Sequence, residues 1–155
     1  MSRTPNPVSE AYGGNAPGSL SSVTYHIAGV LTTVYGLDEL SEYQPKDVAC
    51  LWLLHPRLQT SEYMQPFVAP AIHDWNARIR DGRTKSRKGL IAASFDQRNH
   101  GTRQVHGIAN EAWKNGNPSH AQDMFCCYRE LLLFPDLTIT YYATERLVTL
   151  HSSVT

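Results

Sequence analysis

Two polar segments hold the side chains whose types and order are suited to chemistry. The first segment is His55-Pro56-Arg57. The second supplies a carboxylate, a guanidinium, an amide, an imidazole and a glycine in quick succession: Asp96, Arg98, Asn99, His100 and Gly101. Carboxylates and imidazoles transfer protons, and backbone N–H groups in tight loops stabilise developing negative charge. Together these two segments are the candidate site of the chain.

Each polar segment directly follows a predicted strand. Residues 48–54 and 89–95 are continuous apolar runs, which are typical of strands buried on both faces of a parallel sheet. Between them, apolar residues at intervals of three and four predict one face of a helix: Met64, Val68, Ile72, Trp75 and Ile79. We expect the helix to start near Pro66 and to kink at Pro70, which removes a hydrogen bond. A strand, a helix and a strand predict a βαβ unit, which places both polar segments at one edge of the sheet.

The flanking regions predict a hairpin and a second helix. β-Branched and aromatic residues surround Ala28-Gly29 between positions 21 and 35, which indicates a hairpin or two short strands. Ser119 and Gln122 have the spacing of a capping box that begins a helix. The predicted fold class is therefore α/β, with a mostly parallel partial sheet, an N-terminal hairpin and helices on the faces of the sheet.

The two ends of the chain differ in composition from this domain. Residues 1–20 are rich in Pro, Gly, Ser and Asn, which predicts a flexible leader. Residues 21–133 form the predicted domain. Residues 134–155 contain a possible strand but no motif, and they are left as an unassigned tail.

The polar segments and the helix between them resemble the α/β-hydrolase fold family of esterases and epoxide hydrolases. In that family one strand ends in H-G-x, a proline-containing helix follows, and the next strand ends in D-x-R-G-x-G-x-S. The corresponding stretches here are His55-Pro56-Arg57, residues 66–72 and residues 96–103. Residues 95–123 are also similar to fungal α/β-hydrolases. The resemblance covers about residues 48–128 and corresponds to the N-terminal portion of the family domain.

The resemblance implies an oxyanion role for the first segment. In the family, the backbone N–H of the residue after H-G helps to form the oxyanion hole, and Arg57 holds that position here. Pro56 replaces the family glycine and fixes φ at about −65°. This replacement changes how the loop places the Arg57 N–H. His55 completes the oxyanion segment.

The resemblance implies a structural role for the second segment. Asp96 and Arg98 match a charged pair of the family that organises the loop beside the active site. Gly101 matches a family glycine, and Asn99 replaces another and tolerates left-handed backbone geometry. His100 is interpreted as a surface or structural residue.

The sequence lacks the remaining parts of a serine hydrolase site. The nucleophile of the family lies in G-x-S-x-G, before an acid and a histidine, and this motif does not occur in the chain. Gly18-Ser19 precedes every predicted strand, and His151 has no nucleophile upstream to serve. We assign no catalytic residue and expect a truncated, inactive homologue of an esterase-like serine hydrolase. The alternative is a non-catalytic α/β fragment or a pseudoenzyme that binds a partner.

Other functional classes are disfavoured by motif spacing. The seven histidines show no H-E-x-x-H pattern, and His120 with Asp123 on one helix face supplies only two metal ligands. Neither strand is followed by G-x-G-x-x-G or a phosphate-binding loop. We therefore expect no metal and no cofactor.

Composition limits which binding partners and which cellular compartment we expect for the chain. Fourteen basic and fourteen acidic residues give a formal net charge of zero, which disfavours nucleic acid. We expect no membrane span and no signal peptide, hence a cytoplasmic protein whose family acts on small, ester-like molecules. Cys50, Cys126 and Cys127 form no framework of pairs and are expected to be reduced thiols.

Overall fold

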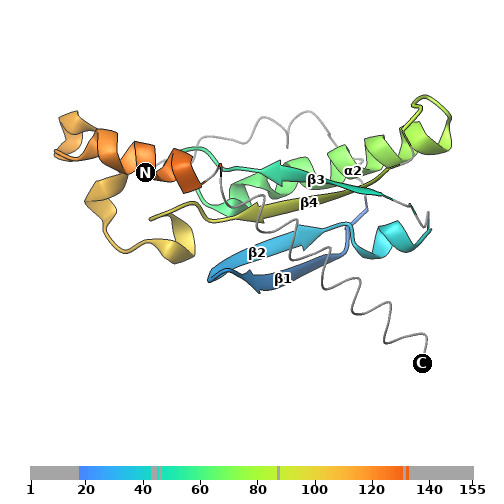
Figure 1. Ribbon diagram of the computed structural model, residues 1–155, viewed down its shortest axis with the longest axis horizontal. Coiled ribbons are helices and arrows are strands. Elements are labelled where there is room, and N and C mark those ends of the chain that lie inside the picture. Colours follow the sequence, from blue (N-terminus) through green and yellow to red (C-terminus); the bar gives the residue numbers. More distant parts are fainter. Residues whose placement is uncertain (1–17, 43–44, 46, 87, 131, 133–155) are drawn as a thin grey trace. The chain divides into compact units, whose positions relative to one another are not determined.

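The computed structural model describes residues 18–42, 45, 47–86, 88–130 and 132 (Figure 1). Four strands of this part form one sheet in the order β1-β2-β4-β3: β1 (Ser22–Ile27), β2 (Val30–Tyr35), β3 (Val48–Leu53) and β4 (Gly89–Phe95). Its helices are α2 (Gln65–Arg80) and a helix over residues 120–130. Short 3-10 turns complete it: Asp38–Glu42, Ser61–Met64, Gly101–Arg103, Gly107–Asn110 and Trp113–Asn115. The predicted tail and most of the predicted leader lie outside the described residues.

The predicted hairpin is confirmed. β1 and β2 are joined by Ala28 and Gly29, whose φ angles are 49° and 79°. Positive φ at both central residues is the property of a type I′ turn, whose twist matches that of the two strands. Two short strands therefore form here because the turn holds them in antiparallel register.

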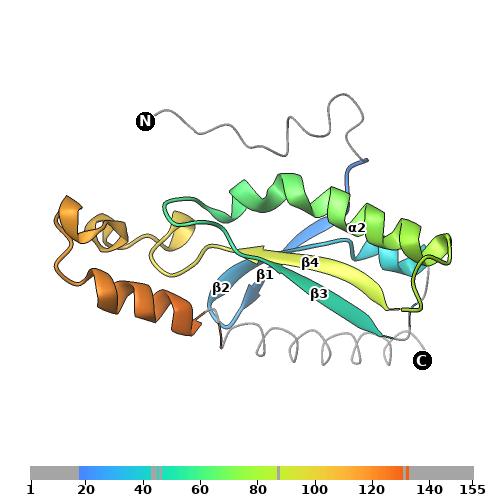
Figure 2. The same cartoon turned by 90° about the horizontal axis from the view of Figure 1, so that it is seen from above.

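The predicted βαβ unit is also confirmed. β3 pairs in parallel with β4, from Val48 opposite Gly89 to Leu53 opposite Ser94. α2 connects the two strands and lies along them (Figure 2). The helix is continuous through Pro70, while Pro66 lies in the first turn, where its missing N–H costs nothing.

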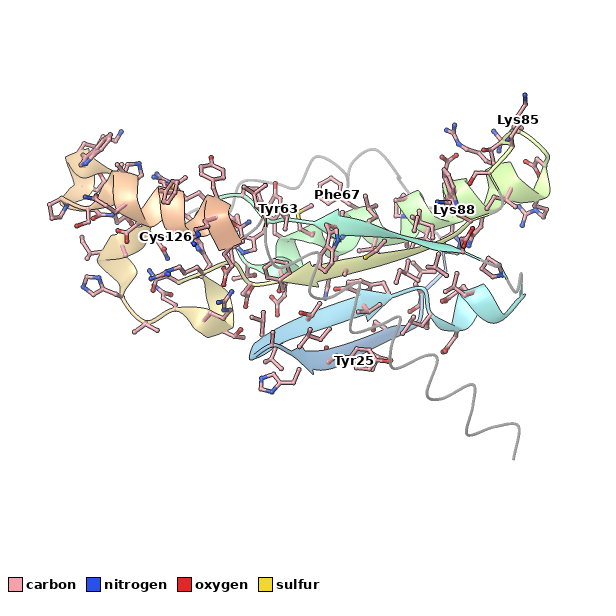
Figure 3. The ribbon with its side chains drawn as sticks, viewed as in Figure 1. Tyr25, Tyr63, Phe67, Lys85, Lys88 and Cys126 are labelled. Atoms are coloured by element: carbon pink, nitrogen blue, oxygen red, sulfur yellow. The ribbon has the colours of Figure 1, made fainter. Side chains whose placement is uncertain are left out.

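The face of α2 that was predicted to be apolar packs on the sheet. Val68 and Ile72 are buried against Tyr35, Leu53 and Ala92. At the other positions of the stripe, Met64, Trp75 and Ile79 are half-buried. Tyr63 and Phe67 form a ring contact at the start of the helix, with centroids 6.4 Å apart (Figure 3).

The end of α2 has a local cause. Gly82 has a φ of 66°, and its N–H bonds to the carbonyl of Ile79. The N–H of Arg83 bonds to the carbonyl of Arg78, which completes a Schellman motif. Asp81-Gly82 therefore ends the helix. The Trp75 indole then bonds to the carbonyl of Lys88, just before β4.

The prediction of a mostly parallel sheet is wrong. The sheet is small and mostly antiparallel, and β3 with β4 is its one parallel pair in the described part of the chain. The hairpin strand β2 adjoins β4, so the βαβ unit contributes a single parallel pairing. Of the two strands predicted to be buried on both faces, β4 is mostly buried, whereas β3 is mostly half-buried. The apolar runs also do not state the direction of the neighbouring strands.

The chain divides into two compact units, which we describe separately. One contains the described residues up to Val23 together with Thr33–Leu53 and Glu62–Ser94. The other contains Thr24–Thr32, Leu54–Ser61 and the described residues from Phe95 onward. Among the described helices, none has the length and apolarity needed to cross a membrane.

Candidate functional site

The two predicted segments meet within the second compact unit. The backbone N–H of Gln97 donates to Nε2 of His55 over 3.0 Å, and the Gln97 side-chain amide donates to the His55 carbonyl. Both residues are buried. The segment after β3 and the segment after β4 therefore lie together, as the parallel pairing of the two strands predicts.

These hydrogen bonds fix the protonation of His55. A backbone N–H can only donate, so Nε2 of His55 must be the unprotonated nitrogen. Its Nδ1 lies 2.9 Å from the Pro56 carbonyl and donates to it. Burial, the largest influence, lowers the pKa of His55 below its usual value of 6.5, and the nearby His100 lowers it further. His55 is consequently a neutral imidazole with a defined tautomer.

The bonded Pro56 carbonyl determines where the next N–H points. This carbonyl accepts both His55 Nδ1–H and the backbone N–H of Gln59 at 3.1 Å. A trans peptide holds its C=O and N–H in opposite directions, so the N–H of Arg57 points away from His55. No described residue accepts a hydrogen bond from it. Leu58 has a φ of 65°, which suits the third position of a type II turn but strains a leucine.

Asp96 organises the second segment through backbone and hydroxyl donors. Its Oδ1 accepts the Ser61 N–H at 2.8 Å. Its Oδ2 accepts the Thr102 N–H at 2.8 Å and the Thr102 hydroxyl at 2.9 Å. Burial alone raises the pKa of Asp96, but the hydrogen bonds from Ser61 and Thr102 outweigh it and hold the pKa below 3.8. The carboxylate is therefore ionised and serves as a structural anchor.

Gly101 allows the loop to fold over this carboxylate. Its φ is 49°, and a Cβ atom there would lie 2.2 Å from Oδ2 of Asp96. Asn99 also adopts a positive φ, of 60°, as its side chain permits. The Asn99 side chain accepts the N–H groups of Val105 and His106, and donates to Asn110. Gly101 therefore allows the loop to approach Asp96, and Asn99 holds the following part of the loop by side-chain hydrogen bonds.

The arginine that fastens the loop is Arg103 and not Arg98. Arg103 pairs with Glu130 through two nitrogens, at 2.5 and 3.1 Å, and also donates to the Asp96 carbonyl. The Arg98 side chain is exposed and makes no ion pair within the described ranges. Its backbone N–H bonds to Glu130 instead. The expected Asp96–Arg98 charged pair is therefore not formed.

His100 is buried, which excludes the surface alternative for this residue. Its Nδ1 lies 2.9 Å from the Arg98 carbonyl and donates to it. Its Nε2 is buried and has no hydrogen-bond partner in the described part of the chain. The His100 ring lies against the His55 ring, with centroids 5.2 Å apart. The pair packs the two segments against each other.

Asn117 is a buried structural residue that the sequence did not point to. Its side-chain amide donates to the carbonyls of Ala109 and Glu111 and to the Asp123 carboxylate, and its Oδ1 accepts the Ser119 N–H. Asn117 therefore joins the loop to the start of the second helix. The available signal was an asparagine two residues before the expected helix cap, a position that favours local side-chain hydrogen bonds.

The cysteines are free, as expected. Burial raises the pKa of Cys50 to about 11, and burial with the neighbouring Glu130 raises the pKa of Cys127. Both thiols are therefore weak nucleophiles at neutral pH. Cys126 lies beside Cys127 on the second helix (Figure 3).

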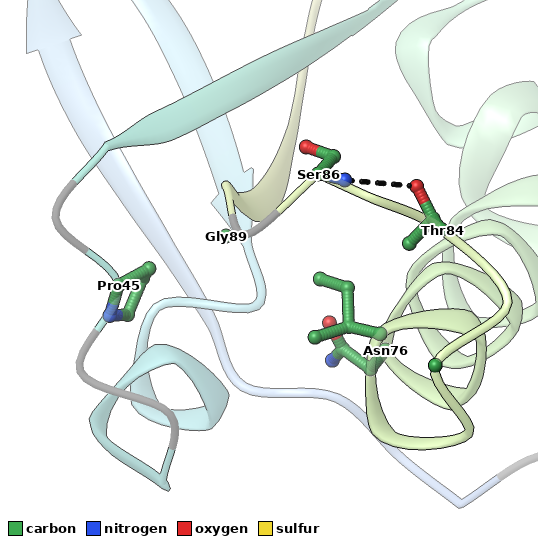
Figure 4. Close-up of a pocket in the computed structure, with 7 residues that line it drawn as sticks. Pro45, Asn76, Thr84, Ser86 and Gly89 are labelled. Atoms are coloured by element: carbon green, nitrogen blue, oxygen red, sulfur yellow. Dashed lines mark hydrogen bonds between the residues drawn. The ribbon is translucent and has the colours of Figure 1, made fainter.

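A pocket of about 380 Å³ lies at the N-terminal end of β4 (Figure 4). Its lining includes Asn76 and Ile79 of α2, Thr84 and Ser86 of the following loop, and Gly89. The candidate segments follow the C-terminal ends of β3 and β4. The pocket therefore shares no lining residue with the predicted site.

The candidate site offers the outward N–H of Arg57 and the neutral imidazole of His55, beside the ionised Asp96. This arrangement can bind and polarise a carbonyl or an oxyanion, but nothing in the sequence assigns it a nucleophile. In the described part of the chain, no group of three or more His, Cys, Asp or Glu side chains is placed to hold a metal ion. Compared with known proteins, the chain matches no family model and resembles no curated protein sequence significantly.

Proposed function

We propose that this chain is an esterase-like α/β-hydrolase homologue that supplies the oxyanion side of an ester-binding site and no nucleophile. The proposal rests mainly on one feature: the Pro56 carbonyl is held by His55 and Gln59, which directs the Arg57 N–H outward. In α/β-hydrolases, an N–H of the loop after the third strand contributes to the oxyanion hole. The loop after β3 has this place in the chain order here.

The strain at Leu58 supports a functional use of this loop. A leucine at a φ of 65° costs about 1–3 kcal/mol, and such residues cluster at ligand-binding sites. Neutral His55 also fits the role, because it orients the loop without bringing a competing charge into the site. Its backbone and side-chain bonds to Gln97 hold the orientation fixed.

Activity measurements test the absence of a nucleophile. We expect no labelling by a fluorophosphonate probe and no turnover of p-nitrophenyl esters above that of the heat-denatured chain, because the sequence has no G-x-S-x-G. Stoichiometric labelling of one serine would contradict this part of the proposal.

A binding measurement tests the oxyanion loop itself. Phenylphosphonate is a suitable probe because its oxygens mimic an oxyanion, and NMR titration of the backbone amides reports where it binds. We expect the Arg57 and Gln97 amide signals to shift together. Arg57→Pro should weaken binding by about tenfold or more, because it removes the donating N–H to a charged group.

Two properties make this substitution a sharp test. Arg57 occupies the second position of a type II turn, where proline is favoured, so the fold should tolerate it. Arg57→Ala keeps the N–H while removing the side chain, and it should bind almost as well as the unchanged chain. Equal losses in both variants would show that the side-chain charge, and not the N–H, attracts the probe. Absence of any amide shift would favour the alternative, a non-catalytic fragment that binds a partner.

A further inference from the structure

The pocket at the N-terminal end of β4 is a second candidate binding site. Its volume of about 380 Å³ is within the range of pockets that hold small molecules. The lining residues drawn in Figure 4 all belong to the compact unit that contains β3 and α2: Pro45, Asn76, Ile79, Gly82, Thr84, Ser86 and Gly89. A single unit therefore supplies this lining.

Pro45 and Ile79 give the pocket apolar surface. Pro45 packs closely against the start of β4, where a Cβ atom added to Gly89 would lie 2.6 Å from Cγ of Pro45. Figure 4 shows Pro45 on one side of the pocket and Asn76 and Thr84 on the other. The pocket can therefore hold a molecule that has both an apolar and a polar part.

The polar side of the pocket supplies hydrogen-bond donors. The Thr84 hydroxyl oxygen accepts the Ser86 N–H at 3.1 Å, and the Ser86 hydroxyl oxygen accepts the Lys88 N–H at 3.3 Å (Figure 4). Each hydroxyl therefore keeps its own hydrogen to donate to a ligand. The Asn76 side chain adds an amide that bonds to no other residue in the described ranges.

Acceptors near the pocket are already occupied. At the end of α2, three carbonyls accept backbone N–H groups of the residues that follow: those of Ala77, Arg78 and Ile79. The Asp81 carboxylate pairs with Arg83 at 3.1 Å. The pocket therefore favours a ligand that brings its own acceptors.

The loop that supplies the two hydroxyls is basic. Residues 83–88 contain no acidic side chain and four basic ones: Arg83, Lys85, Arg87 and Lys88. Lys85 and Lys88 are exposed and form no ion pair with any described residue (Figure 3). In the sequence they adjoin the lining residues Thr84, Ser86 and Gly89. Lysine charge beside hydroxyl donors suits a phosphate group.

We propose that this pocket binds a small phosphate monoester. The phosphate oxygens accept hydrogen bonds from the hydroxyls of Thr84 and Ser86, beside the two lysines of the loop. The remainder of the molecule packs against Ile79 and Pro45. This inference is independent of the proposed hydrolase relationship, because the pocket shares no lining residue with the candidate segments.

NMR titration with ribose 5-phosphate tests the pocket. We expect the amide signals of Thr84, Ser86 and Gly89 to shift together and to saturate. Ribose at the same concentrations should leave them unchanged, because it lacks the charged acceptor. Absence of these shifts, shifts that do not saturate, or equal shifts with ribose would overturn the proposal. Shifts at Arg57 and Gln97 alone would place the phosphate at the oxyanion loop and would also overturn it.

Asn76→Asp tests the site by charge, and Gln122→Glu is its matched control. Aspartate has the size of asparagine, so the fold should tolerate it, but its carboxylate repels a phosphate. We expect the dissociation constant to rise about tenfold or more. Gln122→Glu makes the same chemical change at an exposed helical position of the other compact unit and should leave binding unchanged. Equal effects of both substitutions would show that overall charge, and not the pocket, attracts the probe.

Thr84→Val and Thr84→Ser separate the hydroxyl donor from the shape of the pocket. Valine has nearly the shape of threonine but cannot donate, so we expect binding to weaken by about tenfold. Serine keeps the donor and should bind almost as well as threonine. Unchanged binding in Thr84→Val, or equal losses in both variants, would overturn the hydroxyl contact.

Discussion

The backbone N–H of Gln97 donates to Nε2 of His55 over 3.0 Å, and the side-chain amide of Gln97 donates to the His55 carbonyl. These two bonds join residues 42 positions apart in the sequence. Because the second nitrogen of the imidazole holds the Pro56 carbonyl, the orientation of the Arg57 N–H depends on Gln97. The loop after β3 is therefore positioned by the loop after β4.

Replacing His55 should destabilise the chain as well as the loop. His55→Gln leaves the buried Gln97 N–H and the Pro56 carbonyl with poorer partners. We expect the free energy of unfolding, measured by urea denaturation, to fall by about 1–3 kcal/mol. The control is His106→Gln, because the His106 side chain is exposed and should contribute less than about 0.5 kcal/mol. Equal effects of both substitutions would contradict the role of His55.

The lowered pKa of His55 predicts a dependence of stability on pH. Burial lowers this pKa from 6.5, so the unfolded chain binds a proton at a higher pH than the folded chain does. The stability contribution of neutral His55 is therefore complete above pH 6.5 and is lost as the pH falls from 6.5 through the lower folded pKa. Thermal unfolding across this range should show a smaller pH dependence in His55→Gln. An unchanged pH dependence in that variant would show that other histidines are responsible.

The elements around the site could be predicted because their signals are local. The apolar run of β3, the helical spacing of α2 and the Asp81-Gly82 end each depend on residues close in sequence. The turn at Ala28-Gly29 has the same character. For these reasons the hairpin, the parallel pair and the connecting helix agree with their predicted places.

The errors concern relationships between distant segments. Local patterns do not state which hairpin strand lies beside β4 or in which direction it runs, and this direction makes the sheet mostly antiparallel. The choice of Arg103 over Arg98 depends on Glu130, which lies 27 residues further along on the second helix. The tautomer of His55 likewise depends on Gln97. Such partners are set by tertiary packing and leave no periodic signal in the sequence.

Gly101→Ala should be more harmful than a change of glycine conformation alone explains. The new Cβ would lie 2.2 Å from Oδ2 of Asp96, and the φ of 49° is unfavourable for alanine. Gly82→Ala has a similar backbone penalty, at a φ of 66°, but its Cβ would meet no atom within 4 Å. We expect Gly82→Ala to cost about 1 kcal/mol and Gly101→Ala clearly more, by chemical denaturation. Similar losses would show that the loop moves away from Asp96 easily.

The roles of Arg103 and Arg98 predict a large loss of stability for one alanine substitution and almost none for the other. Arg103 is partly buried and bonds to both Glu130 and the Asp96 carbonyl, whereas the Arg98 side chain is exposed. We expect Arg103→Ala to lower the free energy of unfolding by about 1–3 kcal/mol and Arg98→Ala to change it by less than about 0.5 kcal/mol.

A double-mutant cycle separates the ion pair from the other contacts of Arg103. Glu130→Gln keeps the size of the side chain, so the coupling energy with Arg103→Ala reports the charged interaction. With side chains about a quarter exposed, at 25% and 23%, this pair is more sheltered than a surface pair, and a coupling of about 1 kcal/mol is expected. Added salt should reduce the coupling only slightly, because a sheltered pair is poorly screened. A coupling near zero would show that the Arg103–Glu130 ion pair does not stabilise the loop. A larger loss in Arg98→Ala would show that Arg98, the arginine of the D-x-R resemblance, holds the loop instead.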